Sequence, residues 1–328
     1  MTGPRVFVSR SVFQEAVDLI ATVAEFTVWP EETPPPYDRL RAEAREADGL
    51  FCLLTDRIDE SLLDDAPRLR VVSNMAVGYD NVDVNAASRR GIYVGNTPGV
   101  LTETTAEFAF ALMLAFARRV PQGDRMVREG RWKTWGPMTL LGSDLRHATL
   151  GIVGLGRIGQ IVARMARGFE MRTVYCSRTR KPEIETRLGI EYAPTLEALL
   201  AQADYVSLHV PLNPETRRLI GEAQFGVMRS NAVLINTARG EVVDQQALVA
   251  ALESGRIGGA ALDVADPEPM APNDPLLKLD NVLVTPHIAS ASRATRLKMA
   301  TMAAQNVVDV LEGRRPTHCV NPEAGGGR

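Results

Sequence analysis

The sequence predicts an α/β protein built from two doubly wound domains, each with a parallel sheet. Short β-rich segments alternate with helical segments along nearly the whole chain, which is typical of parallel sheets covered by helices. Several expected strands, among them DYVSLHV and NAVLINTA, are almost continuously apolar, as strands buried on both faces are. The chain has 328 residues. Because a single core stops growing at roughly 250 to 300 residues, two domains are expected.

The two sheets are expected one after the other along the chain. Strands of the first sheet are predicted at 5–9, 25–29, 49–54, 69–76 and 92–96. A long apolar helix follows the break at Pro98 and Gly99. Strands of the second sheet are predicted at 149–153, 172–177, 204–210, 231–238, 258–265 and 281–289. An amphipathic helix is predicted at 293–311.

The composition indicates a soluble, cytoplasmic protein that does not bind polyanions. Charged residues make up 23% of the chain and the formal net charge is −3, so the basic excess that favours nucleic acids or anionic membranes is absent. The longest apolar run, 108–117, is about half of the ~20 residues that span a bilayer. Three well-separated cysteines favour reduced thiols. We therefore expect no nucleic-acid partner, no membrane partner and, since no Cys/His cluster has metal spacing, no metal site.

The most informative local motif is GLGRIG, which follows the apolar strand TLGIV and opens a helix. In a dinucleotide-binding turn the first glycine permits the turn, the second admits the pyrophosphate and the third lets the helix pack on the strand. The helix N-terminus then faces the anion. The motif predicts a Rossmann-type domain, and the turn residues expected to contact the cofactor are Gly154, Leu155, Gly156, Arg157, Ile158 and Gly159.

The next strand, MRTVYCS, ends about 20 residues later without the acidic residue that holds the ribose 2′-hydroxyl of NAD. Ser177 stands at that point and is followed by Arg178, Thr179, Arg180 and Lys181. A carboxylate would repel a 2′-phosphate, whereas hydroxyl groups and cations attract one. The sequence therefore favours NADP(H) as the preferred cofactor, with NAD(H) as the second. A solvated basic loop is the alternative interpretation.

Titratable residues follow the strands of the second sheet, at the edge where open parallel sheets bind ligands. Arg239 follows NAVLINTA, Glu268 follows GGAALDVADP, and His287 follows NVLVTP. Taken singly, each fits a surface ion pair or a structural histidine. As an ordered set they are candidates for catalysis. His209 also ends a strand and is expected to line a wall of the cofactor site.

These motifs, in this order, resemble the D-isomer-specific 2-hydroxyacid dehydrogenases, and glyoxylate/hydroxypyruvate reductases in particular. The matching segments are VGYDNVD at 77–83, NTPGVLTETTAE at 96–107, GIVGLGRIG at 151–159, INTARGEVVD at 235–244, ALDVADPEP at 261–269 and TPHIASAS at 285–292. They extend over nearly the whole chain, so the resemblance is more specific than any single motif.

The resemblance implies an NADP(H)-preferring enzyme that reduces a small 2-oxo acid to the D-2-hydroxy acid. Arg239, Glu268 and His287 match the family's catalytic residues. His287 is then the general acid, Glu268 favours its protonated form, and Arg239 binds the substrate carboxylate or carbonyl. The backbone N–H groups of Val77 and Gly78 are expected to bind further carboxylate oxygens, so the implied substrate contacts are Val77, Gly78, Arg239 and His287.

The resemblance also implies unequal roles for the two domains. Residues 1–100 and 290–328 are expected to form a discontinuous, flavodoxin-like substrate-binding domain, and 101–289 a Rossmann-type dinucleotide-binding domain. Further implied cofactor contacts are Thr105, Ser177, Arg178, Thr179, His209, Val210, Pro211, Thr237, Ala238, Asp263 and Ala289. Asp263 is expected to bond the nicotinamide amide, and Ala289 departs from the glycine that the family usually has after PHI. An aromatic residue equivalent to Trp132 or Trp135 reaches the partner subunit's site in related reductases, which implies a homodimer.

Two alternatives remain open from the sequence. Phosphoglycerate, formate and phosphite dehydrogenases share the pattern, although the loop at 74–79 lacks the lysine of phosphite enzymes and the chain leaves no room for the regulatory domain of many phosphoglycerate enzymes. Dinucleotide-sensing corepressors share the fold and retain the catalytic residues. Turnover of a 2-oxo acid distinguishes an enzyme from such a sensor.

Overall fold

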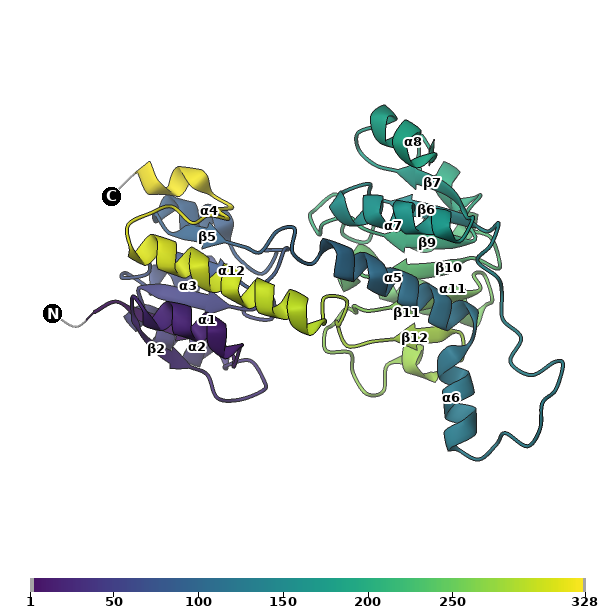
Figure 1. The fold of residues 1–328 in the computed structure, drawn as a ribbon, viewed down its shortest axis with the longest axis horizontal. Coiled ribbons are helices and arrows are strands. Elements are labelled where there is room, and N and C mark those ends of the chain that lie inside the picture. Colours follow the sequence, from purple (N-terminus) through teal and green to yellow (C-terminus); the bar gives the residue numbers. More distant parts are fainter. Residues whose placement is uncertain (1–2, 327–328) are drawn as a thin grey trace. The chain divides into compact units, whose positions relative to one another are not determined.

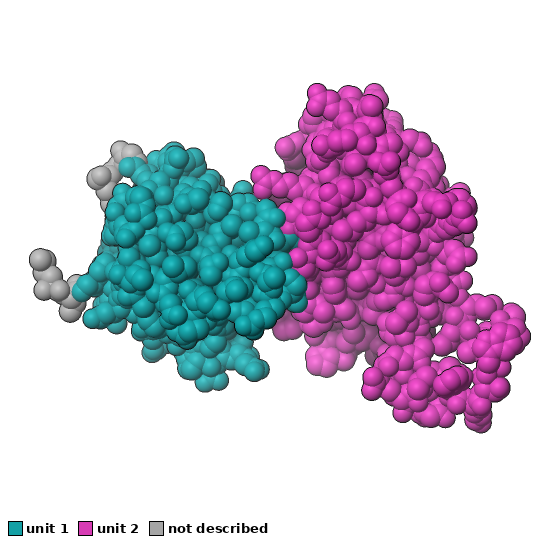
Figure 2. Space-filling model, in the orientation of Figure 1, with its two compact units in different colours: residues 1–101, 291–328 teal, residues 102–290 magenta. Residues whose placement is uncertain are grey.

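The computed structural model describes residues 3–326 and divides the chain into two compact units. Unit 1 comprises residues 1–101 and 291–328, and unit 2 comprises residues 102–290 (Figure 2). Each unit has its own parallel sheet, flanked by helices. The predicted fold class, two doubly wound parallel-sheet domains, is thereby confirmed.

Unit 1 contains a five-stranded parallel sheet in the order β2-β1-β3-β4-β5 (Figure 1). This is the flavodoxin-like strand order. The strands are β1 (Arg5–Val8), β2 (Glu25–Val28), β3 (Gly49–Cys52), β4 (Val71–Asn74) and β5 (Tyr93–Gly95). The helices are α1 (Gln14–Ala21), α2 (Tyr37–Glu46), α3 (Glu60–Asp64), α4 (Val84–Arg89) and α12 (Arg293–Leu311), followed by the 3₁₀ helix η3 (Pro322–Gly326).

Successive side chains along each strand of the first sheet are buried under different helices. Phe7 and Leu50 lie in one cluster with α2, α3 and α4. Val8 and Phe51 lie in another with α1 and α12. The period of two along each strand explains this division, because successive side chains point to opposite faces. α12 packs along α1 and the sheet (Figure 1), so the C-terminal segment completes the core that the N-terminal segment begins.

Unit 2 contains a seven-stranded parallel sheet in the order β12-β11-β10-β9-β6-β7-β8. Counted with β6 as the first strand, this is the Rossmann strand order with β12 as one additional edge strand. The strands are β6 (Thr149–Val153), β7 (Arg172–Cys176), β8 (Glu191–Tyr192), β9 (Tyr205–Leu208), β10 (Val233–Asn236), β11 (Gly259–Leu262) and β12 (Val282–Val284). The helices are α5 (Thr102–Ala117), α6 (Val120–Arg128), α7 (Arg157–Gly168), α8 (Pro182–Leu188), α9 (Leu196–Leu200), α10 (Glu222–Val227) and α11 (Gln245–Glu253), with 3₁₀ helices η1 (Gly240–Val242) and η2 (Pro275–Lys278).

Helices cover both faces of the second sheet. α5 and α7 bury Leu150 and Ile152 of β6 on one face. α9, α10 and α11 bury Val206 and Leu208 of β9 on the other face. Because both faces are covered, β6 and β9 are buried at every position, which explains the nearly continuous apolar runs in the sequence.

The structure adds one short edge strand to the sequence prediction. β8 has only two residues, too few to produce a recognisable pattern. The predicted strands generally extend beyond the observed ones, since their last residues belong to the loops that carry the site. Within residues 3–326, no helix is long and apolar enough to cross a membrane.

Candidate active site

Most of the residues proposed from the sequence gather at one edge of the unit 2 sheet. The strands are parallel and paired in register, so the loops that follow β6, β7, β9, β10, β11 and β12 leave the sheet at its carboxyl edge. These loops contain the glycine turn, the basic loop, His209, Arg239, Asp263 and His287. Val77 and Gly78 are different: they follow β4 in unit 1.

The glycine turn is shaped by close contacts that only glycine allows. Gly154 has φ +95°, and a Cβ there would lie 2.7 Å from the carbonyl oxygen of His209. A Cβ on Gly159 would lie 2.3 Å from the carbonyl oxygen of Gly154. At Gly156, by contrast, an added Cβ meets no heavy atom within 4 Å. The open side of Gly156 has the shape expected where a pyrophosphate approaches the backbone.

The start of α7 presents backbone donors at this turn. No side chain caps the helix, and the N–H of Gly156 donates to no acceptor within residues 3–326. Uncapped N–H groups and the positive end of the helix dipole favour an anion at this point. The turn and the helix start therefore fit the diphosphate of a dinucleotide.

The basic loop divides into residues with different partners. Arg180 bonds Glu185 at 2.9 Å and lies over the ring of Tyr192, so it is held on the body of the unit. Arg178 is 88% exposed and approaches Glu215 only to 3.9 Å. The hydroxyl of Ser177 donates to the carbonyl of Thr179 at 2.7 Å, which organises the loop instead of leaving the hydroxyl as a free donor.

His209 lies beside the glycine turn and is uncharged at neutral pH. Its Nε2 shares a 2.8 Å hydrogen bond with the hydroxyl of Ser207, and burial lowers the pKa of His209 to about 4. Its backbone carbonyl packs on Gly154. The loop from His209 to Pro211 therefore borders the glycine turn, without a titrating charge at neutral pH.

His287 and Glu268 form the central polar contact of the edge. Nδ1 of His287 lies 2.6 Å from Oε1 of Glu268. The two side chains are 22% and 34% exposed, so solvent reaches the pair only in part. His287 has φ +54°, a left-handed conformation that is uncommon for residues other than glycine and often marks functional sites.

Asp263 holds the loop that carries His287. One carboxylate oxygen accepts bonds from the Thr285 hydroxyl at 2.6 Å and the Ile288 N–H at 2.8 Å, and the other accepts the Ala289 N–H at 2.7 Å. Burial raises the pKa of Asp263, and these bonds and His287 oppose that rise. The family resemblance implied a cofactor contact for Asp263. In the structure its carboxylate fixes the strained backbone at His287.

Arg239 lies in a loop that two other residues shape. Asn236 accepts the N–H of Ala238 at 3.0 Å and donates to the carbonyl of Arg239 at 2.8 Å. Gly240 is required because an added Cβ would lie 1.9 Å from the carbonyl oxygen of Ala265. That close approach brings the Arg239 loop against the segment leading to Glu268. An asparagine at a strand end was the available sequence signal for Asn236.

Two further residues fit a bound cofactor. The hydroxyl oxygen of Thr237 is buried and has no hydrogen-bond partner within the described residues, although buried hydroxyls normally have one. Thr105 is buried in the first turns of α5. Together with the open glycine turn, the unpartnered Thr237 hydroxyl fits a polar ligand along this edge.

The loop after β4 in unit 1 presents two adjacent backbone donors. The carbonyl of Val77 accepts from Asn96 at 2.8 Å and that of Gly78 from Asn74 at 3.0 Å. The N–H groups of Val77 and Gly78 donate to nothing within residues 3–326. The two asparagines therefore fix the loop by its carbonyl groups and leave its N–H groups available to a carboxylate.

Asn306 supports this loop from a distant segment. Its fully buried side chain, on α12, donates to the carbonyl of Asn96 at 3.0 Å and accepts the N–H of His318 at 3.1 Å. Asn306 and Asn96 are 210 positions apart. This contact could not be predicted from the sequence, since neither residue belongs to a periodic or spaced pattern that includes the other.

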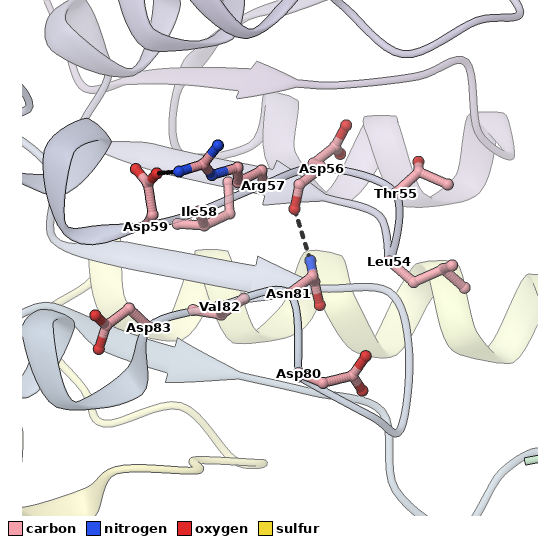
Figure 3. Close-up of a pocket in the computed structure, with 10 residues that line it drawn as sticks. All are labelled: Leu54, Thr55, Asp56, Arg57, Ile58, Asp59, Asp80, Asn81, Val82 and Asp83. Carbon is pink, nitrogen blue, oxygen red and sulfur yellow. Dashed lines mark hydrogen bonds and ion pairs between the residues drawn. The ribbon is translucent and has the colours of Figure 1, made fainter. Parts of the chain in front are cut away.

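A separate pocket of about 380 Å³ lies in unit 1 between residues 54–59 and 80–83 (Figure 3). Arg57 pairs with Asp59 at 2.7 Å, and Asn81 donates to the carbonyl of Asp56 at 2.9 Å. Asp59 and Asp83 cap α3 and α4. Local structure accounts for these polar groups, and the pocket contains none of the residues proposed from the sequence.

Comparison with known proteins agrees with this architecture. The family model described as "D-isomer specific 2-hydroxyacid dehydrogenase, NAD binding domain" matches residues 110–289. A glyoxylate reductase of Aeropyrum pernix is 54% identical over 327 residues, covering 98% of this chain and 97% of its own. A Thermus thermophilus protein of solved structure has a TM-score of 0.90 and 47% identity, with 96% of this chain and 99% of that one covered.

One solved relative is named for its cofactor. The NADPH-dependent glyoxylate/hydroxypyruvate reductase of Sinorhizobium meliloti, in complex with NADP and malonate, has a TM-score of 0.88 and 34% identity, and the match covers 99% of this chain and 98% of that one. The matched family model and the identity over the full length together show that the chain belongs to the D-isomer-specific 2-hydroxyacid dehydrogenase family.

Proposed function

We propose that the protein is an NADP(H)-preferring reductase of a small 2-oxo acid, glyoxylate or hydroxypyruvate, and forms the D-2-hydroxy acid where the product is chiral. The observation that carries the proposal is the 2.6 Å contact between His287 and Glu268 at the sheet edge that also holds the glycine turn. Relatives named glyoxylate reductase support the substrate class. In this proposal unit 2 is the dinucleotide-binding domain and unit 1 the substrate-binding domain.

The reaction needs a proton donor for the carbonyl oxygen that becomes the hydroxyl. Glu268 bonds Nδ1 of His287, so we assign Nε2 as the nitrogen that delivers the proton. A carboxylate at Nδ1 stabilises the imidazolium and fixes the ring orientation. In this proposal His287 is the general acid, and Glu268 orients its imidazole through Nδ1.

The substrate carboxylate requires donors of matching geometry. We assign this role to the guanidinium of Arg239, whose planar donors suit carboxylates, and to the backbone N–H groups of Val77 and Gly78. Asn236, Asn74 and Asn96 orient these donors through the bonds described above.

The cofactor is held by the carboxyl edge of unit 2. When bound, the nicotinamide supplies the hydride that reduces the substrate carbon. The turn from Gly154 to Gly159 would hold the diphosphate, and Thr105 and the loop at 209–211 would line its surroundings. Thr237, Ala238, Asp263 and Ala289 would hold the nicotinamide. Thr237 has a buried hydroxyl to offer.

Preference for NADP(H) rests on the loop after β7. Ser177, and not a carboxylate, stands directly after β7, and the exposed Arg178 offers a cation to a 2′-phosphate. Ser177 and Thr179 shape the loop around it. The NADPH-dependent relative supports this preference. NAD(H) stays a second cofactor, because the glycine turn does not distinguish the two dinucleotides.

The proposal is tested by initial rates of NADPH and NADH oxidation with glyoxylate and with hydroxypyruvate. Wild-type protein should turn over both acids, faster with NADPH. His287→Gln should lower kcat by about 10²- to 10⁴-fold, because general-acid catalysis contributes that much. His147→Gln changes an exposed histidine of the same unit and should leave the rates unchanged. Tight dinucleotide binding without turnover of either acid would contradict the proposal and favour another substrate or a dinucleotide sensor.

The three cysteines fit the cytoplasm expected from the sequence. Cys52, Cys176 and Cys319 are all free thiols, as is usual in a reducing compartment. Burial raises the pKa of each thiol, which lowers its reactivity. We therefore assign the cysteines no part in the reaction.

A further inference from the structure

We propose that Lys181 is a positioning residue for the glycine turn: it fixes and polarises the Leu155–Gly156 peptide so that the Gly156 N–H faces the diphosphate of either nicotinamide dinucleotide. The inference rests on the proposed function in taking a dinucleotide as the ligand of unit 2. It assigns to the last cation of the basic loop a task different from binding the 2′-phosphate.

The contact on which this depends joins two loops. The ammonium nitrogen of Lys181 lies 2.8 Å from the carbonyl oxygen of Leu155. The side-chain amide of Gln160 reaches the same oxygen at 3.4 Å and is the weaker donor. Leu155 itself is buried, so the turn is anchored by its side chain and oriented by its carbonyl group.

The orientation of that carbonyl determines where the next N–H points. In a trans peptide the C=O and the following N–H point in opposite directions, and the peptide between Leu155 and Gly156 is not among the cis peptides of the chain. A carbonyl directed at Lys181 therefore turns the Gly156 N–H away from Lys181, and that N–H donates to no acceptor within residues 3–326. The residue also has free space beside it, since an added Cβ on Gly156 meets no heavy atom within 4 Å. A charged donor on the carbonyl also polarises the peptide and strengthens its N–H as a donor.

Lys181 is itself firmly placed. Its backbone N–H donates to Oη of Tyr175 at 2.7 Å, and that hydroxyl donates to Glu185 at 2.7 Å. The ring of Tyr175 is fully buried in β7. Burial, followed by the bond to Glu185, raises the pKa of Tyr175 to about 12, so the hydroxyl stays protonated and the arrangement holds at neutral pH.

The partners of the neighbouring cations distinguish their roles. Arg180 is bound to Glu185 and stacked on Tyr192. Arg178 extends into solvent. Lys181 alone of the three contacts the glycine turn among the described residues. Removing Lys181 should therefore weaken both dinucleotides, whereas removing Arg178 should weaken only the one with a 2′-phosphate.

The test measures binding by isothermal titration calorimetry, in the absence of a 2-oxo acid, with NADP⁺, NAD⁺, ADP and AMP. Lys181→Met should weaken NADP⁺, NAD⁺ and ADP by a similar factor of about ten, as expected for loss of a charge-assisted hydrogen bond. It should leave AMP, which has no diphosphate, unchanged. Lys181→Arg should restore most of the affinity, and Arg180→Ala, which removes an equal charge from the same loop, should affect the four ligands far less.

Several outcomes would overturn the inference. Weaker binding of NADP⁺ alone in Lys181→Met would make Lys181 a 2′-phosphate contact. Equal losses for ADP and AMP would indicate general damage to the adenosine site. Unchanged affinities for all ligands would show that the contact has no consequence. Wild-type protein that binds neither NADP⁺ nor NAD⁺ would contradict the proposed function itself, which keeps that failure separate from the others.

Discussion

Two arginines of the basic loop show how position in the fold assigns different roles to identical side chains. Arg178 and Arg180 are two residues apart, yet the first is 88% exposed and the second is bonded to Glu185 and stacked on Tyr192. A guanidinium that already bonds a carboxylate and stacks on a ring has fewer N–H donors left for a phosphate. Selectivity between the cofactors should therefore depend on Arg178.

Arg178→Ala should lower kcat/KM for NADPH by about 10- to 100-fold and leave kcat/KM for NADH nearly unchanged, because hydrogen bonds between charged groups contribute about 1.5 to 3 kcal/mol. Arg180→Ala is the matched control, with the same loss of charge. It should change the ratio of the two kcat/KM values little. Parallel losses for NADPH and NADH in Arg178→Ala would show that this loop does not recognise the 2′-phosphate.

His287 illustrates how a strained residue is maintained. Its positive φ is unfavourable for a side chain with a Cβ, and the surrounding structure has to compensate for it. The carboxylate of Asp263 does so by accepting three bonds from residues 285, 288 and 289. The imidazole thereby meets Glu268 in one defined geometry.

At the scale of elements, the glycine turn separates two reasons for requiring glycine. Gly159 is needed for packing, since its missing side chain lets α7 approach β6. At Gly156, by contrast, no contact within the described chain requires glycine, because an added Cβ would meet no heavy atom within 4 Å. One position therefore serves the fold and the other serves a ligand.

Gly159→Ala should destabilise unit 2 by about 1 to 3 kcal/mol, because the new methyl group would overlap the Gly154 carbonyl and force a backbone shift. Gly156→Ala should keep the melting temperature close to that of the wild type. It should nevertheless weaken dinucleotide binding by about tenfold or more, since its methyl group occupies the approach of the diphosphate. Differential scanning fluorimetry and dinucleotide titration provide the two readouts. If Gly156→Ala bound dinucleotides with wild-type affinity, the diphosphate could not bind at this turn, and the prediction would be wrong.

At the scale of the whole molecule, one segment of unit 2 is poorly covered by the rest of the described chain. α6 buries none of its residues, and the following loop extends from the body of the unit (Figures 1 and 2). Large apolar side chains are exposed along this arm: Val120, Val127, Trp132, Trp135, Met138, Leu140 and Leu141. A cluster of this kind is typical of an interface. We propose that it supports the homodimer implied by the family resemblance.

The wild-type protein should sediment as a dimer of twice 35.8 kDa. The double variant Trp132→Ser/Trp135→Ser should shift toward monomer, because the two side chains are 61% and 79% exposed in the single chain and large aromatic groups dominate interface energies. Phe26→Ser, which changes an exposed aromatic residue of unit 1, is the control and should remain dimeric. Analytical ultracentrifugation at several concentrations makes the measurement. A monomeric wild-type protein, or a double variant that sediments like it, would contradict the proposal.

The sequence by itself determined the class of the fold and the main chemical groups of the candidate site. Alternating apolar strands and helices are local patterns, so both parallel sheets and the helix at 293–311 could be predicted from them. The glycine motif was recognisable because it directly follows an apolar strand and opens a helix, and both features are local. His287 and Glu268 were recognisable because parallel strands deliver their ends to one edge.

Only the tertiary structure decided which side chains hold that site in place. The bonds from Lys181 to Leu155 and from Asn306 to Asn96 join segments 26 and 210 positions apart. The strand order, too, depends on which segments pair in space. Such partners are selected by the packing of the whole chain, because a side chain bonds whatever group the fold brings within about 3 Å. No periodic pattern or residue spacing in the sequence predicts which groups come that close in space.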